Sequence, residues 1–327
     1  MCLMVPFSSA LGQAAPVAKA ELLIDRPDFR PCDRSPGGRY LLGLVGAPGA
    51  PRSLYLADAD RERDPFKVDE RVLWGRNSAD GRWIAYLKEG REGPELYLAD
   101  RYGKKKKRLA HRRKFEIGKS EDNRITGAAM DWSNSSGSVY LALTEAGLPG
   151  RIRIKRVNLE GRVSSALTVE SISSCGDGPI RSLDVHEAST QVLFVAGAEG
   201  AVCLGAYVRQ GERFSDVSVP CPGATVLHAF FDPRGERIYL LTDADLMRDP
   251  KEKPSGDSGR QARLYALRIR DWNLSSVEEY SIRGDGAPND VLVAPSPGNR
   301  FMDLFFTELN GGASKVHMVR RMHPSSR

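Results

Sequence analysis

The chain has 327 residues, of which 41% are hydrophobic and 28% charged, a composition that allows a sizeable core to be buried. The formal net charge of +6 is modest, but one short segment holds many of the basic residues. The sequence contains no run of about 18 apolar residues, so no transmembrane helix is predicted in it.

Residues 1–19 are set apart from the predicted fold. The stretch 2–11 is mostly apolar, and Gly12-Gln13-Ala14 places small residues at the spacing that a signal peptidase reads. No Lys or Arg precedes the apolar run. Two interpretations remain open: a secretory leader whose basic start is missing from the chosen start codon, or a disordered tail. The first predicts a periplasmic or secreted protein.

The rest of the chain repeats one pattern. Residues 20–25 (AELLID) form a first predicted strand without a partner nearby, and six units follow, each with a polar turn and a short apolar run. The turns begin at Ser35, Ser78, Ser133, His186, Asp232 and Ser296. A second run trails each turn, at 53–58, 95–100, 151–161, 201–208, 263–271 and 315–321. A weaker run precedes five of the turns, at 72–74, 128–132, 182–185, 226–231 and 291–294.

This pattern predicts an all-β protein. The runs are short and rich in Leu, Ile, Val, Tyr and Phe, and no apolar segment keeps a helical period over a dozen residues. A sheet of three or four strands cannot bury both of its faces alone, whereas six sheets placed radially shield one another. We therefore expect a six-bladed β-propeller of four-stranded antiparallel sheets over residues 20–323, with a tail at 324–327. Because the last unit has no room for an outer strand, residues 20–25 should pair onto the last blade and close the ring.

The repeat resembles that of TolB-type six-bladed propellers. The resemblance rests on S-P-x-G or its equivalent, a small apolar strand and x-L-Y-L-x-D, and it is clearest at 35–58 and 78–100. It implies the architecture and leaves the function open, because the repeat recurs in bacterial periplasmic scaffold proteins and in the propellers of prolyl-oligopeptidase-type enzymes. Trp-Asp (WD40) repeat propellers match less well, because no Gly-His and Trp-Asp pairing recurs.

A search for catalytic motifs yields no constellation. The G-x-S-x-G nucleophile elbow is absent, and the five histidines form no H-E-x-x-H pair, so no metal or other cofactor is predicted. Propellers place ligand sites at the mouth of the central channel. Candidate residues there, near the start of the apolar strands, are Arg34, Asp131, Asp184 and Asp290.

The unusual feature is a basic segment. Eight of the eleven residues from 104 to 114 are Lys or Arg: Lys104, Lys105, Lys106, Lys107, Arg108, Arg112, Arg113 and Lys114. Like charges side by side on a strand are unfavourable, so we expect a strand edge that runs into an exposed loop. Either the lysines block sheet-to-sheet aggregation, or they bind an anionic membrane surface, a protein partner or, with few aromatics nearby, less favourably nucleic acid.

Three functions follow as hypotheses. The first is a non-catalytic, monomeric propeller scaffold that binds another protein in the bacterial envelope or secreted space. The second is a small-ligand binder or enzyme with its site at the channel mouth, and the third is a binder of anionic surfaces or nucleic acid through the basic segment. Of the five cysteines, Cys203 and Cys221 flank a predicted hairpin, where Cys203 should face a residue near 218. A disulfide between them would be out of register, and buried free thiols are the alternative.

Overall fold

The structure is a computed structural model that describes the following parts of the chain: residues 21–24, 29–35, 39–46, 52–58, 64–115, 125–133, 135–145, 152–169, 180–186, 191–196, 203–208, 213–218, 226–232, 235–242, 261–268, 273–281, 291–295, 301–310 and 313–322. Within these parts, strands form six four-stranded antiparallel sheets, and the one helical turn is the 3-10 helix η1 (Arg112–Phe115). None of these parts contains a helix that is long and apolar enough to span a membrane.

The first three sheets follow the chain order. The first sheet contains β2 (Phe29–Arg34), β3 (Tyr40–Val45), β4 (Ser53–Asp58) and β5 (Phe66–Glu70). The second sheet contains β6 (Val72–Asn77), β7 (Trp83–Gly90), β8 (Gly93–Asp100) and β9 (Lys107–His111). The third sheet contains β10 (Ile125–Trp132), β11 (Ser138–Glu145), β12 (Ile152–Asn158) and β13 (Val163–Val169).

The next two sheets repeat this order, and the last one differs. The fourth sheet contains β14 (Ile180–His186), β15 (Gln191–Ala196), β16 (Cys203–Val208) and β17 (Arg213–Ser218). The fifth contains β18 (Val226–Phe231), β19 (Arg237–Thr242), β20 (Gln261–Arg268) and β21 (Asn273–Ser281). The sixth contains β22 (Val291–Pro295), β23 (Phe301–Asn310) and β24 (Ala313–Met322), and its fourth strand is β1 (Glu21–Ile24) from the other end of the chain.

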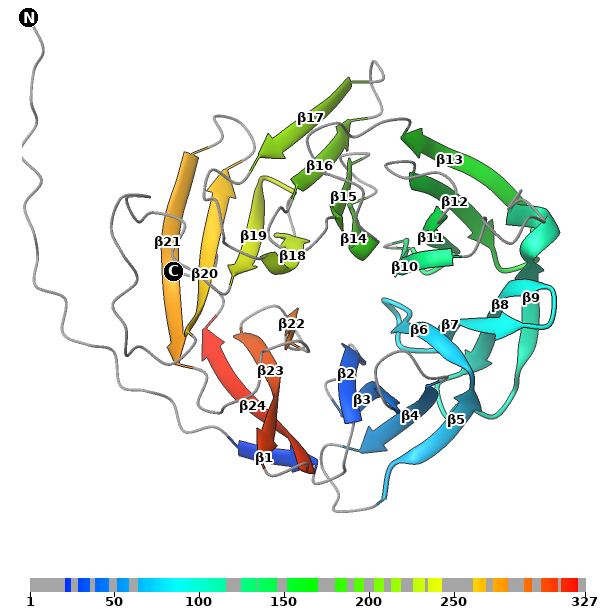
Figure 1. The fold of residues 1–327 in the computed structure, drawn as a ribbon, viewed down its shortest axis with the longest axis horizontal. Coiled ribbons are helices and arrows are strands. Elements are labelled where there is room, and N and C mark those ends of the chain that lie inside the picture. Colours follow the sequence, from blue (N-terminus) through cyan, green and yellow to red (C-terminus); the bar gives the residue numbers. More distant parts are fainter. Residues whose placement is uncertain are drawn as a thin grey trace, which may run out of the picture.

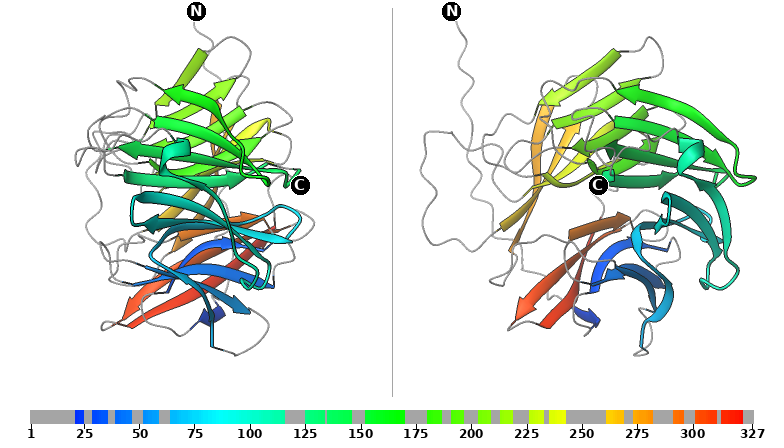
Figure 2. Two further views of the ribbon diagram at one scale, coloured as in Figure 1. Left: turned by 90° about the vertical axis from the view of Figure 1, so that its right-hand side faces the viewer. Right: turned by 45° about the vertical axis from the view of Figure 1, so that its right-hand side comes forward.

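The sheets are arranged around a common centre, as Figures 1 and 2 show. The first strand of each sheet lies innermost, and these strands (β2, β6, β10, β14, β18 and β22) pack against one another from sheet to sheet. The outer strand of the sixth sheet is β1, which pairs antiparallel with β24 and sets Leu22 opposite His317. This is the pairing that the sequence predicted for residues 20–25.

In four of the six repeats, the polar residue that opens the turn stabilises a hairpin. The hydroxyl oxygens of Ser35, Ser78 and Ser133 accept hydrogen bonds from the amides of the residues five positions later, at 3.0 Å in each case. In the fifth sheet the Asp232 carboxylate takes the same role for the amide of Arg237, at 3.0 Å. The repeated Ser or Asp is therefore explained by turn geometry, since its side chain satisfies a backbone donor that the hairpin leaves open.

The cores lie between neighbouring sheets. Between the first and second sheets, Leu42, Leu54, Ile84 and Tyr86 are all fully buried in one cluster. The strand β7 shows why its sequence is continuously apolar: every residue from Ile84 to Leu87 is buried, because the strand is covered on both faces.

Several strands were not predicted. The sequence interpretation missed the innermost strand of the first sheet, β2, and assigned no bounds to the outer strands β5, β9, β13, β17 and β21. Outer strands such as β5 (FKVDE) have one covered face at most and carry a weak apolar signal. The register of one hairpin was predicted correctly, since Cys203 pairs with Ser218. Cys221 lies outside the described residues.

Candidate functional site

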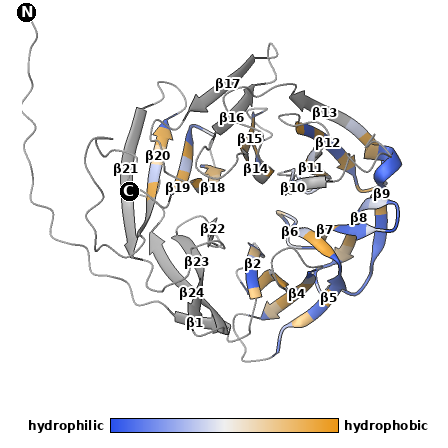
Figure 3. Cartoon of the chain, in the orientation of Figure 1, coloured by the Kyte–Doolittle hydropathy of each residue, from blue (hydrophilic) through white to orange (hydrophobic). Residues whose placement is uncertain are grey.

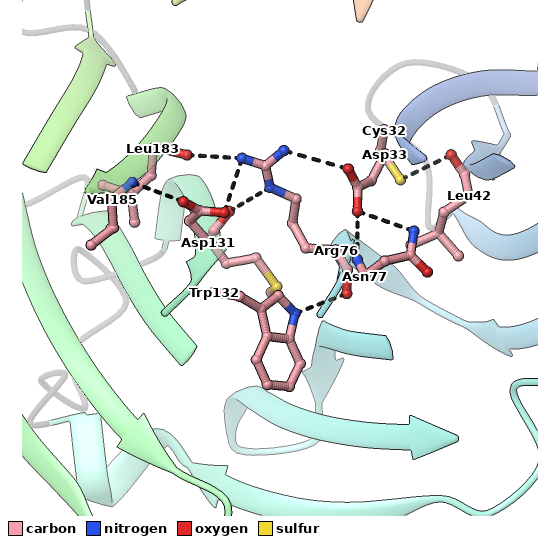
Figure 4. A network of polar contacts seen from close by, with 10 residues as sticks. Cys32, Asp33, Leu42, Arg76, Asn77, Asp131, Trp132, Leu183 and Val185 are labelled. Carbon is pink, nitrogen blue, oxygen red and sulfur yellow. Dashed lines mark hydrogen bonds and ion pairs between the residues drawn. The ribbon is translucent and has the colours of Figure 1, made fainter. Parts of the chain in front are cut away.

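A charged network lies near the common centre of the described sheets, at the ends of the innermost strands (Figure 4). Arg76 occupies its middle and projects from β6. One guanidinium nitrogen lies 3.5 Å from a carboxylate oxygen of Asp33 on β2, and another lies 3.1 Å from Asp131 on β10. The side chains of these three residues are only 11–15% exposed. We call Asp33, Arg76, Asp131 and Asp184 the central network.

The remaining donors of Arg76 also reach across sheet boundaries. Its Nε donates to the carbonyl of Met130, and its Nη2 donates to the carbonyl of Leu183 on β14, both at 3.2 Å. In the opposite direction, the indole N–H of Trp132 donates to the carbonyl of Arg76 at 3.2 Å. One side chain in the second sheet thus contacts the first, third and fourth sheets.

The three carboxylates form a repeated contact between neighbouring sheets. Asp33 accepts a hydrogen bond from the backbone amide of Asn77 in the next sheet. Asp131 accepts from the amide of Val185 at 2.8 Å, and Asp184 from the amide of Phe231 at 2.6 Å. Each carboxylate therefore joins the innermost strand of its own sheet to that of the sheet that follows.

Burial changes the protonation of these carboxyl groups. It raises the pKa of Asp131 to about 7, although the nearby Arg76 guanidinium acts in the opposite direction. Burial likewise raises the pKa of Asp33 and of Asp184 above the ordinary carboxyl value, again against the effect of Arg76. After burial, the negative charge of the neighbouring Asp184 also raises the pKa of Asp131.

Beside the network lies a cysteine that has the properties of a core residue. The Cys32 thiol is buried and donates to the carbonyl of Leu42 at 3.5 Å. Burial raises the pKa of this thiol, and the negative charge of the neighbouring Asp33 raises it further. The thiol therefore remains protonated at neutral pH. Cys32 is therefore a buried free thiol.

The predicted channel-mouth residues are placed unevenly. Asp131 and Asp184 are members of the central network, and they lie near the ends of the innermost strands rather than at the starts of the strands that follow. Arg34 ends β2, next to the network member Asp33. Asp290 lies outside the described residues. Within the described residues no cluster of His, Cys, Asp or Glu is arranged to hold a metal ion.

Sequence reasoning missed Asp33 and Arg76, although a positional signal existed. Each member of the central network lies two residues before the residue that opens the repeat turn, which is Ser35, Ser78, Ser133 or His186. The fifth and sixth repeats carry Phe230 and Ala294 at this position. Aligning the repeats at this offset would have found one Arg among three Asp.

The basic segment forms more structure than expected. Lys107–His111 is the outer strand β9, and η1 follows it, so the segment runs from an exposed turn into a strand rather than from a strand into a loop. The burial of Leu109 and Ala110 against the third sheet stabilises the strand despite its charges. Figure 3 shows hydrophilic residues on β9 and η1, at the outer edge of the second sheet.

Four of the eight predicted basic residues are held by internal contacts. Arg108 pairs with Glu95 at 2.8 Å, and Arg112 donates to the carbonyl of Glu92 at 3.0 Å. Lys107 and Lys114 donate to backbone carbonyls in the turn between β12 and β13 of the third sheet. The described residues offer no side-chain hydrogen bond or ion pair to the other four, Lys104, Lys105, Lys106 and Arg113.

Comparison with known proteins places the fold and leaves the activity open. No protein-family model and no curated protein matches the chain. Among solved structures, an oligogalacturonate lyase in complex with manganese is similar with a TM-score of 0.57 and 13% identity, covering 94% of this chain and 97% of that one. Hydrazine synthase from Kuenenia stuttgartiensis is similar with a TM-score of 0.54 and 10% identity, covering 91% of this chain and 80% of that one.

TolB structures are also among the similar ones, as the repeat motif predicted. TolB from Acinetobacter baumannii matches with a TM-score of 0.47 and 14% identity over 93% of this chain, and this chain spans 66% of that protein's length. The described sheets and the two higher-scoring structures define the fold as a β-propeller of antiparallel four-stranded sheets. At these identities the similarity concerns the fold alone.

Proposed function

We propose that this protein is a non-catalytic β-propeller scaffold that binds another protein in the bacterial envelope or secreted space. The proposal rests on one observation: the side chains of the central network form hydrogen bonds between neighbouring sheets. Its carboxylates bond the amides of Asn77, Val185 and Phe231 in neighbouring sheets, and Arg76 bonds three sheets at once. Because these side chains already form hydrogen bonds between sheets, they stabilise the arrangement and have few donors or acceptors left for a substrate.

We also infer that the six sheets are the blades of one closed ring over residues 20–323. The pairing of β1 with β24 supports this, because it unites the two ends of the chain in one sheet. Such closure protects an edge that would otherwise be open to other chains. The proposed envelope or secreted location rests on the leader-like residues 1–19 and on the resemblance of the repeats to TolB-type propellers.

Affinity capture under native conditions tests the scaffold. The tagged full chain should retain a specific partner protein from envelope extracts of its own cells, after cross-linking and stringent washing. A tagged unrelated propeller serves as the control. The absence of any specific partner, together with recovery of the native protein in the cytoplasmic fraction, would refute the proposal.

A second candidate function is favoured by one observation, the raised pKa of Asp131 beside Asp184. A carboxyl group that titrates near neutral pH is suited to general acid–base catalysis if a substrate reaches it. Screening for hydrolase and lyase activities at high protein concentration, with Asp131→Asn and Asp184→Asn as controls, tests this alternative. An activity that both variants lose while they remain folded would replace the scaffold proposal.

A further inference from the structure

The turn between β8 and β9, Arg101–Lys106, presents several positive charges at the surface. We call it the basic turn. All of its residues but Gly103 are exposed, and within the described part of the chain the side chains of Lys104, Lys105 and Lys106 make no hydrogen bond or ion pair. The charge of Lys105 acts together with the backbone amides of Lys104 and Tyr102 to lower the pKa of Asp100. Lys104–Lys106 also precede β9 rather than lying on it. Edge protection therefore does not account for these three lysines, since the strand edge begins only at Lys107.

The edge of β9 has other cover. The turn between β12 and β13 lies against it, and a side chain at Gly161 would meet the carbonyl oxygen of Leu109 at 2.3 Å. Lys107 and Lys114 bond to carbonyls of that same turn. A partner strand is thus kept from the middle of β9, and binding at this place has to use the side chains of the basic turn.

The backbone of the basic turn is held in place from two sides. The Asp100 carboxylate accepts hydrogen bonds from the amides of Tyr102 and Lys104, at 3.1 and 2.8 Å. Gly103 has a φ of 70°, and a side chain there would meet Val68 of the first sheet at 2.8 Å. The backbone from which the three lysines extend is therefore fixed, which reduces the conformational entropy lost when a partner binds.

The basic turn also carries an exposed aromatic side chain. Tyr102 is 44% exposed, and the Arg101 guanidinium lies over its ring, 4.8 Å from the centroid. Phe66, which is 48% exposed, lies two residues along β5 from the Val68 that the turn contacts. Exposed Tyr and Arg beside exposed charges match the composition of protein-binding hot spots.

We propose that the basic turn docks an acidic segment of a partner protein, with Tyr102 contacting an apolar side chain in that segment. The inference rests on the proposed scaffold function and adds the surface and the chemistry of the partner. Charge complementarity calls for Asp and Glu opposite Lys104–Lys106. The fixed turn favours a protein over a fluid anionic membrane, because only a partner of defined shape gains from preorganised donors.

Peptide binding to the full chain tests the proposal. A fluorescent peptide of about twelve residues, rich in Asp and Glu with one central Leu, is titrated and followed by anisotropy at about 50 and about 200 mM salt. The variant K104Q/K105Q/K106Q should bind about tenfold more weakly, as expected for three exposed charge pairs. The control R71Q/R82Q/R91Q removes three exposed charges from the same sheet, outside the basic turn, and should stay within about twofold of the unchanged protein.

The aromatic contact is tested separately. Tyr102→Ala should weaken binding of the Leu-containing peptide several-fold, and it should leave a second peptide, with Ser in place of Leu, unaffected. General electrostatic attraction would treat the two peptides alike. Equal losses in the two triple variants would overturn the proposal. So would lysine-dependent binding to phosphatidylserine vesicles or single-stranded RNA with no binding to either peptide.

The two proposals can fail independently. If K104Q/K105Q/K106Q retains the envelope partner as well as the unchanged protein does, the basic turn is not the docking surface, and the scaffold function stands. If the peptides bind as expected, no envelope partner is captured and the native protein is recovered in the cytoplasmic fraction, the surface chemistry stands and the scaffold proposal fails.

Discussion

Replacing Arg76 by Met should destabilise the protein strongly and in a pH-dependent manner. The substitution removes the ion pairs to Asp33 and Asp131 and the bonds to the carbonyls of Met130 and Leu183. Removing one partner of a buried ion pair costs about 3–5 kcal/mol, chiefly because the other charge stays buried and unpaired. We expect a loss of this size in the free energy of unfolding at pH 8.

The pH dependence follows from the raised carboxyl pKa values. Between about pH 4 and pH 7 the folded state binds more protons at Asp131 than the unfolded state does, so stability falls as the pH rises through this window. Arg76 opposes this effect in the unchanged protein. Without it the carboxyl groups prefer protonation more strongly, and the loss caused by R76M should therefore be smaller at pH 5 than at pH 8.

Urea unfolding at pH 5 and pH 8, followed by tryptophan fluorescence, measures this difference. The variant R71M removes the exposed pair with Glu89, whose two side chains are each 51% exposed, and should cost less than about 1 kcal/mol at either pH. The triple variant R76M/D33N/D131N should recover part of the stability at pH 8, because no unpaired charge remains at these positions. A loss in R76M that is below 1 kcal/mol, or equal at both pH values, would refute the reasoning.

Two further predictions concern single positions. Asp131→Asn should reduce the fall in stability between pH 5 and pH 8, because the variant lacks the carboxyl group with a pKa near 7. The Asn side chain still offers an oxygen to the Val185 amide. An unchanged dependence of stability on pH in urea titrations would count against the assignment. Gly161→Ala should destabilise the protein by about 2 kcal/mol or more in the same assay, since Gly161 has a φ of 80° and the new methyl group would meet the Leu109 backbone; Gly137→Ala, at a glycine with ordinary contacts, is the control.

The repeating local signals made much of the fold predictable. The residues that open the turns, such as Ser78 and Ser133, and the buried runs that follow them report directly on hairpins and doubly covered strands. The outer strands were harder to find. In β9 (KRLAH) only Leu109 and Ala110 are buried, in a cluster that includes residues of the third sheet such as Val157, about fifty residues later in the chain. No local pattern contains that contact.

Only part of the central network was predicted, again because its contacts join residues that are far apart in the sequence. Asp131 and Asp184 stood out as acidic residues before apolar strands, but their partners lie 54 and 47 residues away. Arg76 links residues of four sheets, and such a link is defined only by the register between innermost strands. In the basic segment, the number of charges is evident from the sequence, but their contacts are not. Only the structure shows that Glu95 and the carbonyls of Leu159 and Gly161 bind three of the basic side chains.

The closed ring is the claim on which the functional proposals depend, and a cross-link between the two chain ends measures it most directly. Leu22 on β1 lies opposite His317 on β24. In the variant L22C/H317C, mild oxidation should join these two positions in the monomer, as peptide mass spectrometry would detect, and the melting temperature should rise because the bond closes a very long loop. The variant L22C/E308C, which places the second cysteine elsewhere on the same sheet, should not cross-link. Equal cross-linking in both variants, or in neither, would contradict the pairing of β1 with β24.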